Sequence, residues 1–361
     1  MADPISSSLQ TSTEDFKKLK LSKDRIEQWE DGMRTDDSKG TYEWWYYDSH
    51  LEDGSKLVII FYTKDIVDTN KNLTPMITIQ YDSPDGAHYA EVLTAPASKF
   101  SAAKDTCNVH IGDNTFVGDL NKYEIKISGK TIQAKVTLTQ RVTPWRPDTG
   151  HICFGNNNEY YFAWLPSIPE GIVEAEVTVD GKTKKASGTG YHDHNWGNIA
   201  MTKLMNHWYW GRAKIGDYSV ISSFITAEEK YGYKTFPIFM LAKGNKVIAD
   251  NALKYLNFSA QEEYLDEVTK KPTHALLIYD YDDGNQHYKI TYRRKADISR
   301  AKFADSLSPV KRFLANLLGF DGAYLRFTGE AKLEKFENGI AVETFTNQAL
   351  WELMYLGHAQ K

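Results

Sequence analysis

The sequence predicts an all-β protein built from antiparallel barrel or sandwich domains, and three observations support this class. Turn signals such as Asp-Gly recur roughly every 8 to 15 residues, which is typical of chains made of short hairpins. Polar and apolar residues alternate between the turns, as in KYEIKISGKTIQAKVTLTQR over residues 122–141. Aromatic residues make up 13% of the chain, and they favour the pleated, half-buried surface of a sheet.

The first segment, residues 1–37, is polar and carries mixed charges, as in STEDFKKLKLSKDRIEQWEDG. A short helix around residues 16–29 is compatible with this pattern, but the apolar residues are too few for an independent unit. We therefore expect a polar arm or a frayed terminus over residues 1–37.

Residues 38–200 predict the first β domain. The apolar run KLVIIFYT follows an Asp-Gly turn at residues 53–54, which indicates a buried strand after a tight turn. NLTPMITIQYD ends at the turn signal SPDG, and GIVEAEVTVDGKTKKASGTGYHDH predicts a hairpin on Asp180-Gly181. Between the hairpins, PWRPDTGHICFGNNN is rich in Pro, Gly and Asn, and we expect a long loop there.

Residues 201–361 predict a second β domain, and we place the boundary between the domains near residues 195–207. Its hairpins turn at Gly216-Asp217, Gly244-Asn245 and Asp283-Gly284. The stretch SPVKRFLANLLGF predicts the one short helix of this domain over residues 308–318, because a proline lies in its first turn and a glycine can end it.

Bulk composition excludes several classes of protein. A net charge of −5 and a pI near 6.1 argue against nucleic acid as a partner, because phosphate binding needs a basic surface. No apolar run approaches the ~20 residues that span a bilayer. We expect a cytoplasmic protein, or a secreted one from which a signal peptide was removed. The oligomeric state is not predicted.

The segment GYHDHNWGN, residues 190–198, is the densest group of chemically active side chains. In an extended strand His192 and His194 share one face, so both could bind a metal together with His207 or an acidic residue. No further His, Cys or acidic group has metal-ligand spacing, and Cys107 and Cys153 form no C-x-x-C pattern. We therefore expect no metal and no cofactor. The G-x-S-x-G motif of serine hydrolases is absent.

An acid–base site is the remaining chemical interpretation of this segment. A buried carboxyl group such as Asp193 would have its pKa raised by desolvation and could donate a proton at neutral pH. Indole and phenol faces can then stabilise a developing cation. The segment YEWWYYD offers a second set of the same groups, namely Glu43, Trp44, Trp45, Tyr46 and Asp48.

A purely structural interpretation stays open. The tryptophans at positions 44, 45, 196, 208 and 210 could be core aromatics, and Asp193, His194 and Asn195 could satisfy turns or buried carbonyls. Alternation also matters, because in an extended segment Asp193 points away from both neighbouring histidines.

EWWYYD followed about 150 residues later by GTGYHDHNWGN resembles the carotenoid 1,2-hydratase (hydroxyneurosporene synthase) and AttH-like family. Kievitone hydratase and the fungal decalin-forming Diels–Alderases are similar in architecture. The resemblance covers residues 40–357. It implies two lipocalin-like β domains around an apolar ligand cavity, and metal-free hydration, dehydration or cyclisation of prenyl, polyene or polyketide-like molecules. The family's motif residues correspond to residues 43–45, 48 and 191–196 of this chain, so the resemblance implies that these form the site.

Together these observations predict an enzyme that performs acid-catalysed hydration, dehydration or cyclisation on a hydrophobic isoprenoid-like molecule. A pericyclic cyclase of a polyketide-like polyene and a lipocalin-like carrier without catalysis remain alternatives. The expected catalytic residues, led by Asp193 as proton donor, are Asp193, His192, His194, Glu43 and Asp48. The expected substrate-binding residues are Trp44, Trp45, Tyr46, Tyr191, Asn195, Trp196, Trp208 and Trp210.

Overall fold

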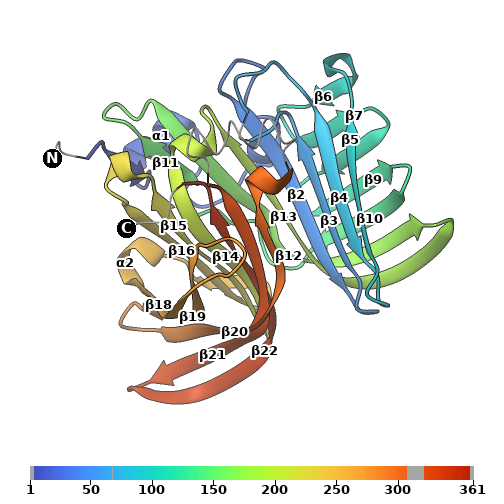
Figure 1. Cartoon of the computed structure of the whole chain (residues 1–361). Coiled ribbons are helices and arrows are strands. Elements are labelled where there is room, and N and C mark those ends of the chain that lie inside the picture. The colour runs from blue at the N-terminus through green and yellow to red at the C-terminus, as the bar shows by residue number, and fades with distance from the viewer. Residues whose placement is uncertain (1–3, 67, 307–320, 358–361) are drawn as a thin grey trace. The chain divides into compact units, whose positions relative to one another are not determined.

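The computed structural model of the chain describes residues 4–66, 68–306 and 321–357. The chain divides into two compact units. The first unit runs from Ser8 to Met201, and the second contains the chain from Thr202 onward together with the residues before Ser8. Each unit is built on one antiparallel sheet, which confirms the predicted all-β class (Figure 1).

Over the described residues, the first sheet has 13 strands in the order β5-β4-β3-β2-β13-β12-β10-β9-β8-β7-β6, with β11 paired to β12 and β1 paired to β11. Most neighbours in this sheet are consecutive in the chain. One non-consecutive pairing places β13 between β2 and β12, and so brings residues 188–197 beside residues 42–51. The strands are β1 (Ser7–Leu9), β2 (Tyr42–Leu51), β3 (Lys56–Tyr62), β4 (Met76–Asp82), β5 (His88–Thr94), β6 (Phe100–Ala102), β7 (Cys107–Ile111), β8 (Asn114–Gly118), β9 (Lys122–Ser128), β10 (Ile132–Gln140), β11 (His151–Phe154), β12 (Tyr160–Val179) and β13 (Lys182–Gly197).

Alternation along the strands produces the core of the first unit. In β9 every second residue is buried, and β3 follows the same period of two. The inward side chains of eight strands, from β2 to β12, form one large hydrophobic cluster, around which the sheet curves (Figure 1). Its large aromatic members are Trp45, Tyr47, Phe61, Tyr81, Phe116 and Tyr123. A smaller cluster of Ala163, Leu165 and Trp196 is separate from this large cluster.

The long hairpin of β12 and β13 carries the segment that the sequence singled out. It turns at Asp180 and Gly181, both with positive φ. Near the turn, a Cβ on Gly188 would lie 2.2 Å from the carbonyl oxygen of His50. The close approach of β2 to β13 therefore requires a glycine at that position.

The N-terminal segment differs from the expected polar arm. Residues 8–37 belong to the first unit and contain helix α1 (Thr13–Leu19) and the 3₁₀ helix η1 (Gln28–Asp31). Ser12 and Asp15 form a reciprocal capping box that starts α1. Glu30 and Asp31 are buried. The expectation of an arm is wrong for residues 8–37, because polar groups deep in the unit hold this segment against the sheet. The predicted loop over residues 144–158 also contains a strand, β11.

In the described chain, the second sheet has nine strands in the order β17-β16-β15-β14-β22-β21-β20-β19-β18. Its core combines tyrosines such as Tyr279 and Tyr292 with Trp351 and aliphatic residues. The elements of this unit are η3 (Met201–Lys203), β14 (Met205–Ile215), β15 (Tyr218–Ala227), η4 (Glu229–Tyr231), β16 (Thr235–Lys243), β17 (Lys246–Ala249), α2 (Ala252–Tyr255), β18 (Leu256–Leu265), β19 (Pro272–Asp282), β20 (His287–Lys302), η5 (Phe303–Ser306), β21 (Ala323–Glu337) and β22 (Ile340–Tyr355); the first unit also contains η2 (Ala97–Lys99).

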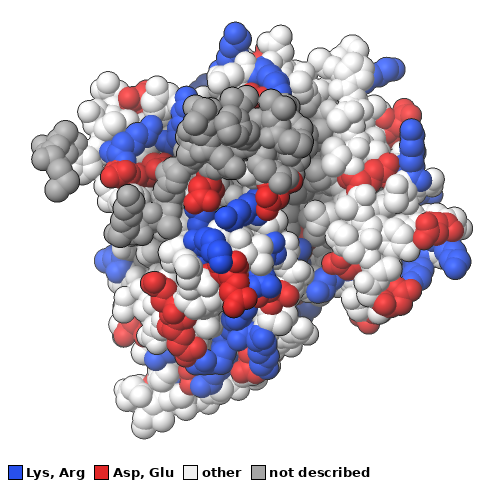
Figure 2. Space-filling view, viewed as in Figure 1, with Lys and Arg blue, Asp and Glu red and all other residues white. Residues whose placement is uncertain are grey.

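The helix predicted over residues 308–318 lies outside the described residues. None of the described helices has the length and apolar character that a membrane crossing needs. Acidic and basic side chains are interspersed across the face shown in Figure 2 and do not form a single basic stripe there.

Candidate functional site

A cavity of about 360 Å³ lies inside the first unit, within the size range of small-molecule sites. The N-terminal segment supplies one side of it, and β11, β12, β13 and the loop before β11 supply the rest. We call it the aromatic cavity, because three tryptophans and a tyrosine line it together with leucines. These four aromatic residues are Trp29, Tyr161, Trp164 and Trp196.

Glu30 and Arg146 form a buried ion pair in the aromatic cavity, whose lining also includes the ionisable residues Asp15, Lys18 and Arg34. Oε2 of Glu30 lies 3.1 Å from Nε of Arg146, and both side chains are buried. Burial raises the pKa of Glu30, although the guanidinium of Arg146 partly offsets that rise. Arg146 also donates a hydrogen bond from Nη2 to the carbonyl of Ser22 and lies over the ring of Phe16. The cavity therefore contains a carboxyl group with increased affinity for a proton, beside a fixed cation.

His151 supplies an imidazole to the same cavity. Its Nδ1 lies 2.8 Å from the carbonyl oxygen of Thr149. Burial, together with the charge of Arg146, lowers the pKa of His151 to about 4, against the opposing effect of the backbone contact. The ring meets Trp196 edge to face at a centroid distance of 5.5 Å. At neutral pH this histidine is uncharged.

Asp193 lies next to the aromatic cavity but is not among its lining residues. Its carboxylate accepts hydrogen bonds of 2.7 Å from Nε1 of Trp164, from the hydroxyl of Tyr191 and from Nδ2 of Asn195. Burial raises the pKa of Asp193 to about 6, although the bonds from Tyr191 and Trp164 lower it in part. Asp193 thus holds Trp164, which does line the cavity.

His192 projects to the other face of β13, into the core, where it meets Asp31. Nε2 of His192 lies 3.1 Å from Oδ2 of Asp31, and Nδ1 lies 2.8 Å from the carbonyl of Tyr46. The hydroxyl of Tyr123 donates to the same Asp31 oxygen. Burial alone would raise the pKa of Asp31, but His192, His194 and Tyr123 together outweigh burial, and the pKa is lowered.

His194 continues this buried network. Its Nε2 lies 2.7 Å from Oε1 of Glu43, and its Nδ1 lies 3.5 Å from Oδ1 of Asp31. Glu43 also accepts hydrogen bonds from the backbone N–H of Arg34 and from the N–H and hydroxyl of Thr35. Glu43 therefore anchors the chain just after η1.

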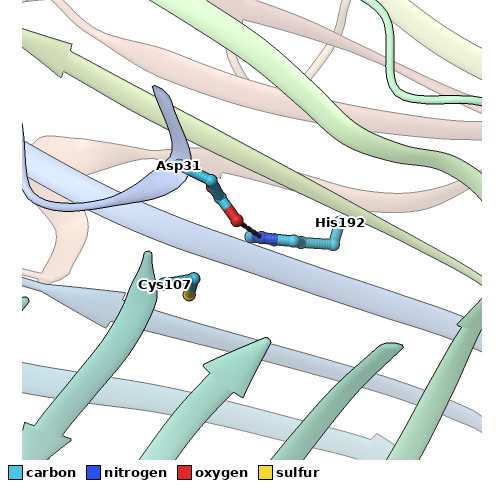
Figure 3. A group of neighbouring side chains, drawn as sticks. All are labelled: Asp31, Cys107 and His192. Carbon is cyan, nitrogen blue, oxygen red and sulfur yellow. Dashed lines mark hydrogen bonds and ion pairs between the residues drawn. The ribbon is translucent and has the colours of Figure 1, made fainter. Parts of the chain in front are cut away.

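Three side chains of the described residues could offer ligands to one metal ion: Asp31, Cys107 and His192, whose ligand atoms lie within 4.8 Å of one another (Figure 3). The sequence did not indicate that Asp31 and Cys107 would lie beside His192. The fold therefore brings together additional candidate ligands that no motif in the sequence showed. The fit is poor nonetheless. His192 and Asp31 already bond each other, and burial raises the pKa of the Cys107 thiol far above its ordinary value. Closed structural zinc sites use four ligands.

The remaining predicted residues are dispersed. Trp45 is a core residue that stacks on His194 at 4.8 Å, and Trp44 is half-buried and stacks on Tyr42. Asp48 is buried and accepts a hydrogen bond of 3.0 Å from Tyr46. Of the thirteen predicted site residues, only Trp196 lines the aromatic cavity. Trp208 and Trp210, like His207, belong to β14 of the second unit.

Sequence reasoning missed Glu30, Asp31, Arg146 and His151. Glu30 and Asp31 fall in the segment interpreted as an arm, and Arg146 and His151 in the segment interpreted as a loop. The signal was present in EQWED and TPWRPDTGH, where a tryptophan accompanies ionisable residues as it does in the two motifs that were recognised.

The family model for Diels-Alderase-like proteins matches residues 3–306. The quinolone epoxide rearrangement protein asqO of Emericella nidulans is 24% identical over 233 residues, which cover 58% of this chain and 60% of that protein. The match therefore spans less than two thirds of that relative's length.

Two solved structures show the same fold. CghA, in a crystal structure with Sch210972, has a TM-score of 0.62 at 12% identity and covers 93% of this chain and 97% of its own. Kievitone hydratase from Nectria haematococca has a TM-score of 0.56 at 12% identity, with 98% of both chains covered. These findings confirm the lipocalin-like fold and the family resemblance that the two motifs indicated.

Proposed function

The chain belongs to the Diels-Alderase-like family, and from this premise we propose that it converts an apolar small molecule by acid-promoted hydration, dehydration, rearrangement or cyclisation in the aromatic cavity. The observation that carries the proposal is the position of Glu30. It is a buried carboxyl group with a raised pKa in a cavity lined by three tryptophans and a tyrosine.

The chemistry follows from these groups. A carboxyl group with a raised pKa is protonated over a wider pH range, so Glu30 can give its proton to an alkene carbon or to an oxygen of the substrate. This protonation leaves a carbon atom of the substrate electron-deficient. Indole and phenol faces stabilise positive charge, and Trp29, Trp164 and Trp196 surround the space where it would develop.

The substrate class is proposed from the cavity and from a relative. The lining is mainly apolar, so it suits a hydrophobic molecule with few polar groups. The named reaction of the relative asqO is a quinolone epoxide rearrangement. An epoxide oxygen that takes a proton from Glu30 would weaken its C–O bond, so we propose an epoxide or an isolated double bond as the reacting group.

Asp193 receives a positioning role in this proposal. Three donors already occupy its carboxylate, and it reaches the cavity through Trp164. The sequence-based choice of Asp193 as proton donor is kept as the competing assignment, since burial raises its pKa to about 6. Glu43 is held by Thr35 and His194, which leaves it a structural anchor.

A pericyclic cyclase is the second candidate, and one observation favours it. Arg146 places a fixed guanidinium in the cavity, where it could polarise a carbonyl of a folded polyene without proton transfer. The family description and the Diels-Alderase pyiF of Pyricularia grisea, 26% identical over 201 residues, agree with this alternative.

The test incubates the purified protein with a quinolone epoxide and, separately, with a linear polyene that carries one carbonyl, and follows products by liquid chromatography and mass spectrometry. Acid-promoted chemistry predicts conversion by the wild type and by the surface control Glu14→Gln, but not by Glu30→Gln. Conversion that survives Glu30→Gln and is lost in Arg146→Gln would favour the pericyclic cyclase. The absence of conversion of both molecules by the wild type would overturn the proposal.

A further inference from the structure

His151 presents one ring nitrogen to the aromatic cavity. A backbone carbonyl only accepts hydrogen bonds, so the contact of 2.8 Å to Thr149 places the imidazole proton on Nδ1. Nε2 is then the nitrogen with the lone pair. Among the described residues Nε2 has no hydrogen-bond partner, although the side chain is 9% exposed and lines the cavity. Nε2 is therefore an acceptor on the lining of the cavity that no protein donor occupies, and the hydroxyl or C–H group of a ligand can approach it there.

The surroundings hold this ring in one orientation. His151 begins β11 and pairs with Ala163 of β12. The ring packs edge to face on Trp196 and lies 5.8 Å from the ring of Tyr161. Thr149, whose carbonyl fixes the tautomer, is itself held in place, because its hydroxyl donates a hydrogen bond of 2.7 Å to the carbonyl of Gln10. The acceptor is therefore preorganised on the rigid sheet.

The charged and titratable groups around His151 favour its neutral form. Burial lowers the pKa of His151, and the charge of Arg146 lowers it further. Glu30, on the same cavity, pairs with that cation. Asp15, Lys18 and Arg34 are the other acidic and basic residues that line the cavity. Cys153 follows two residues later on β11, and burial raises the pKa of its thiol to about 11, so this thiol stays neutral. The cavity thus combines a carboxyl group that tends to keep its proton with an imidazole that tends to lack one.

We propose that Nε2 of His151 accepts the proton that the substrate loses, that Glu30 on the same cavity donates one, and that the reaction is therefore a net isomerisation. This inference rests on the proposed function and narrows it. Two groups of the cavity whose proton affinities are shifted in opposite directions are the pattern expected for a paired acid and base.

The proton balance of an epoxide rearrangement illustrates the step. Glu30 protonates the epoxide oxygen, the C–O bond breaks with its electron pair on oxygen, and a carbon becomes cationic. Nε2 of His151 then takes a proton from the neighbouring carbon, and the pair of that C–H bond forms a new double bond. The product is an isomer of the substrate. Glu30 is left as a carboxylate and His151 as an imidazolium, and exchange of one proton with solvent restores both.

The first test needs no substrate. Imidazole ¹⁵N shifts of the wild type, with His151 assigned by comparison with His151→Gln, should show at pH 6 a neutral ring protonated at Nδ1. A ring protonated at Nε2, or an imidazolium at that pH, would overturn the inference. The surface variant His88→Gln serves as the control for the assignment, because His88 is exposed and contacts Asp82.

The second test uses 2-naphthol, a flat apolar molecule that becomes a strong acid when excited and releases its proton to a nearby base. We expect the wild type and His88→Gln to give naphtholate emission that His151→Phe reduces several-fold. Equal emission from the wild type and His151→Phe would overturn the inference. The turnover assay separates the two proposals: loss of turnover in Glu30→Gln with full turnover in His151→Gln would defeat only the role of His151.

Discussion

The indole nitrogen of Trp164 donates a hydrogen bond of 2.7 Å to the carboxylate of Asp193, and this bond joins the aspartate of HDHNW to the aromatic cavity. The histidines of the same segment face the other way, toward Asp31 and Glu43. One strand thus supports the cavity from both of its faces. On one face Asp193 holds a lining tryptophan, and on the other the histidines hold the chain that follows Glu30.

The bond between Trp164 and Asp193 predicts how Asp193 affects stability across pH. Burial raises the pKa of Asp193 from its ordinary value near 3.8 to about 6. Between about pH 4 and 6 the native state therefore binds more protons than the unfolded chain, and stability falls as pH rises, by on the order of 3 kcal/mol in total. The variant Asp193→Asn has no carboxyl group to titrate at this position, so it lacks this fall in stability. Its stability relative to the wild type, from urea unfolding, should rise from pH 4 to 6 and then level off. The exposed control Asp105→Asn should differ from the wild type in unfolding free energy by the same amount at every pH. The same behaviour in Asp193→Asn would contradict this account.

Trp164→Phe should alter the same pH window. The substitution removes the indole N–H that lowers the pKa of Asp193, so that pKa should rise further above 6. The fall in stability with pH would then extend to higher pH, which urea unfolding at several pH values can detect. Trp29→Phe is the matched control, because Trp29 also lines the cavity, whereas the side chains that donate to Asp193 are Trp164, Tyr191 and Asn195. The double variant with Asp193→Asn should lose the effect, and its persistence there would refute this explanation.

Asp31→Asn should destabilise the first unit strongly. Asp31 is 1% exposed and faces both His192 and His194, so its removal leaves buried imidazole nitrogens without the carboxylate that they contact. Leaving a buried polar group without its hydrogen-bond partner typically costs about 1–3 kcal/mol of unfolding free energy. Asp24→Asn, at an exposed position of the same segment, should change stability by less than about 0.5 kcal/mol. Equal effects of the two variants in denaturant titrations would show that the network does not hold the segment.

Arg146→Gln should move the pH dependence of turnover. A proton donor works only while protonated, so activity falls as pH rises through its pKa. The guanidinium of Arg146 lowers the pKa of Glu30, and its removal should shift the falling limb of the kcat profile to higher pH. Arg141→Gln, which lies outside the cavity, should leave the limb in place. A shift to lower pH in Arg146→Gln would identify a different donor.

The sequence predicted the strands well, because alternation and turn residues are local signals. β9 and β10 follow KYEIKIS and IQAKVTLTQ, and the turn at Asp180-Gly181 lies at the tip of its hairpin. It also predicted that Asp193 would point away from its neighbouring histidines, since that follows from the period of a strand alone.

The site could not be predicted in the same way. Glu30 and His151 meet in one cavity only because η1 and β11 pack against the same part of the sheet, over 100 residues apart in the chain. The burial of Asp31 depends on partners at positions 123, 192 and 194. A polar segment held by such partners has the composition of an exposed arm, and nothing local distinguishes the two.

The measurement that tests the central claim most directly is kcat of Glu30→Gln on a substrate that the wild type converts, with the dissociation constant of the same molecule measured by tryptophan quenching. A positioned proton donor typically contributes 10²–10⁴-fold, so kcat should fall by about that factor while binding changes little. Asp193→Asn, measured alongside, should retain more activity than Glu30→Gln. A wild-type kcat in Glu30→Gln, or a greater loss in Asp193→Asn, would contradict the assignment and return the role of donor to Asp193.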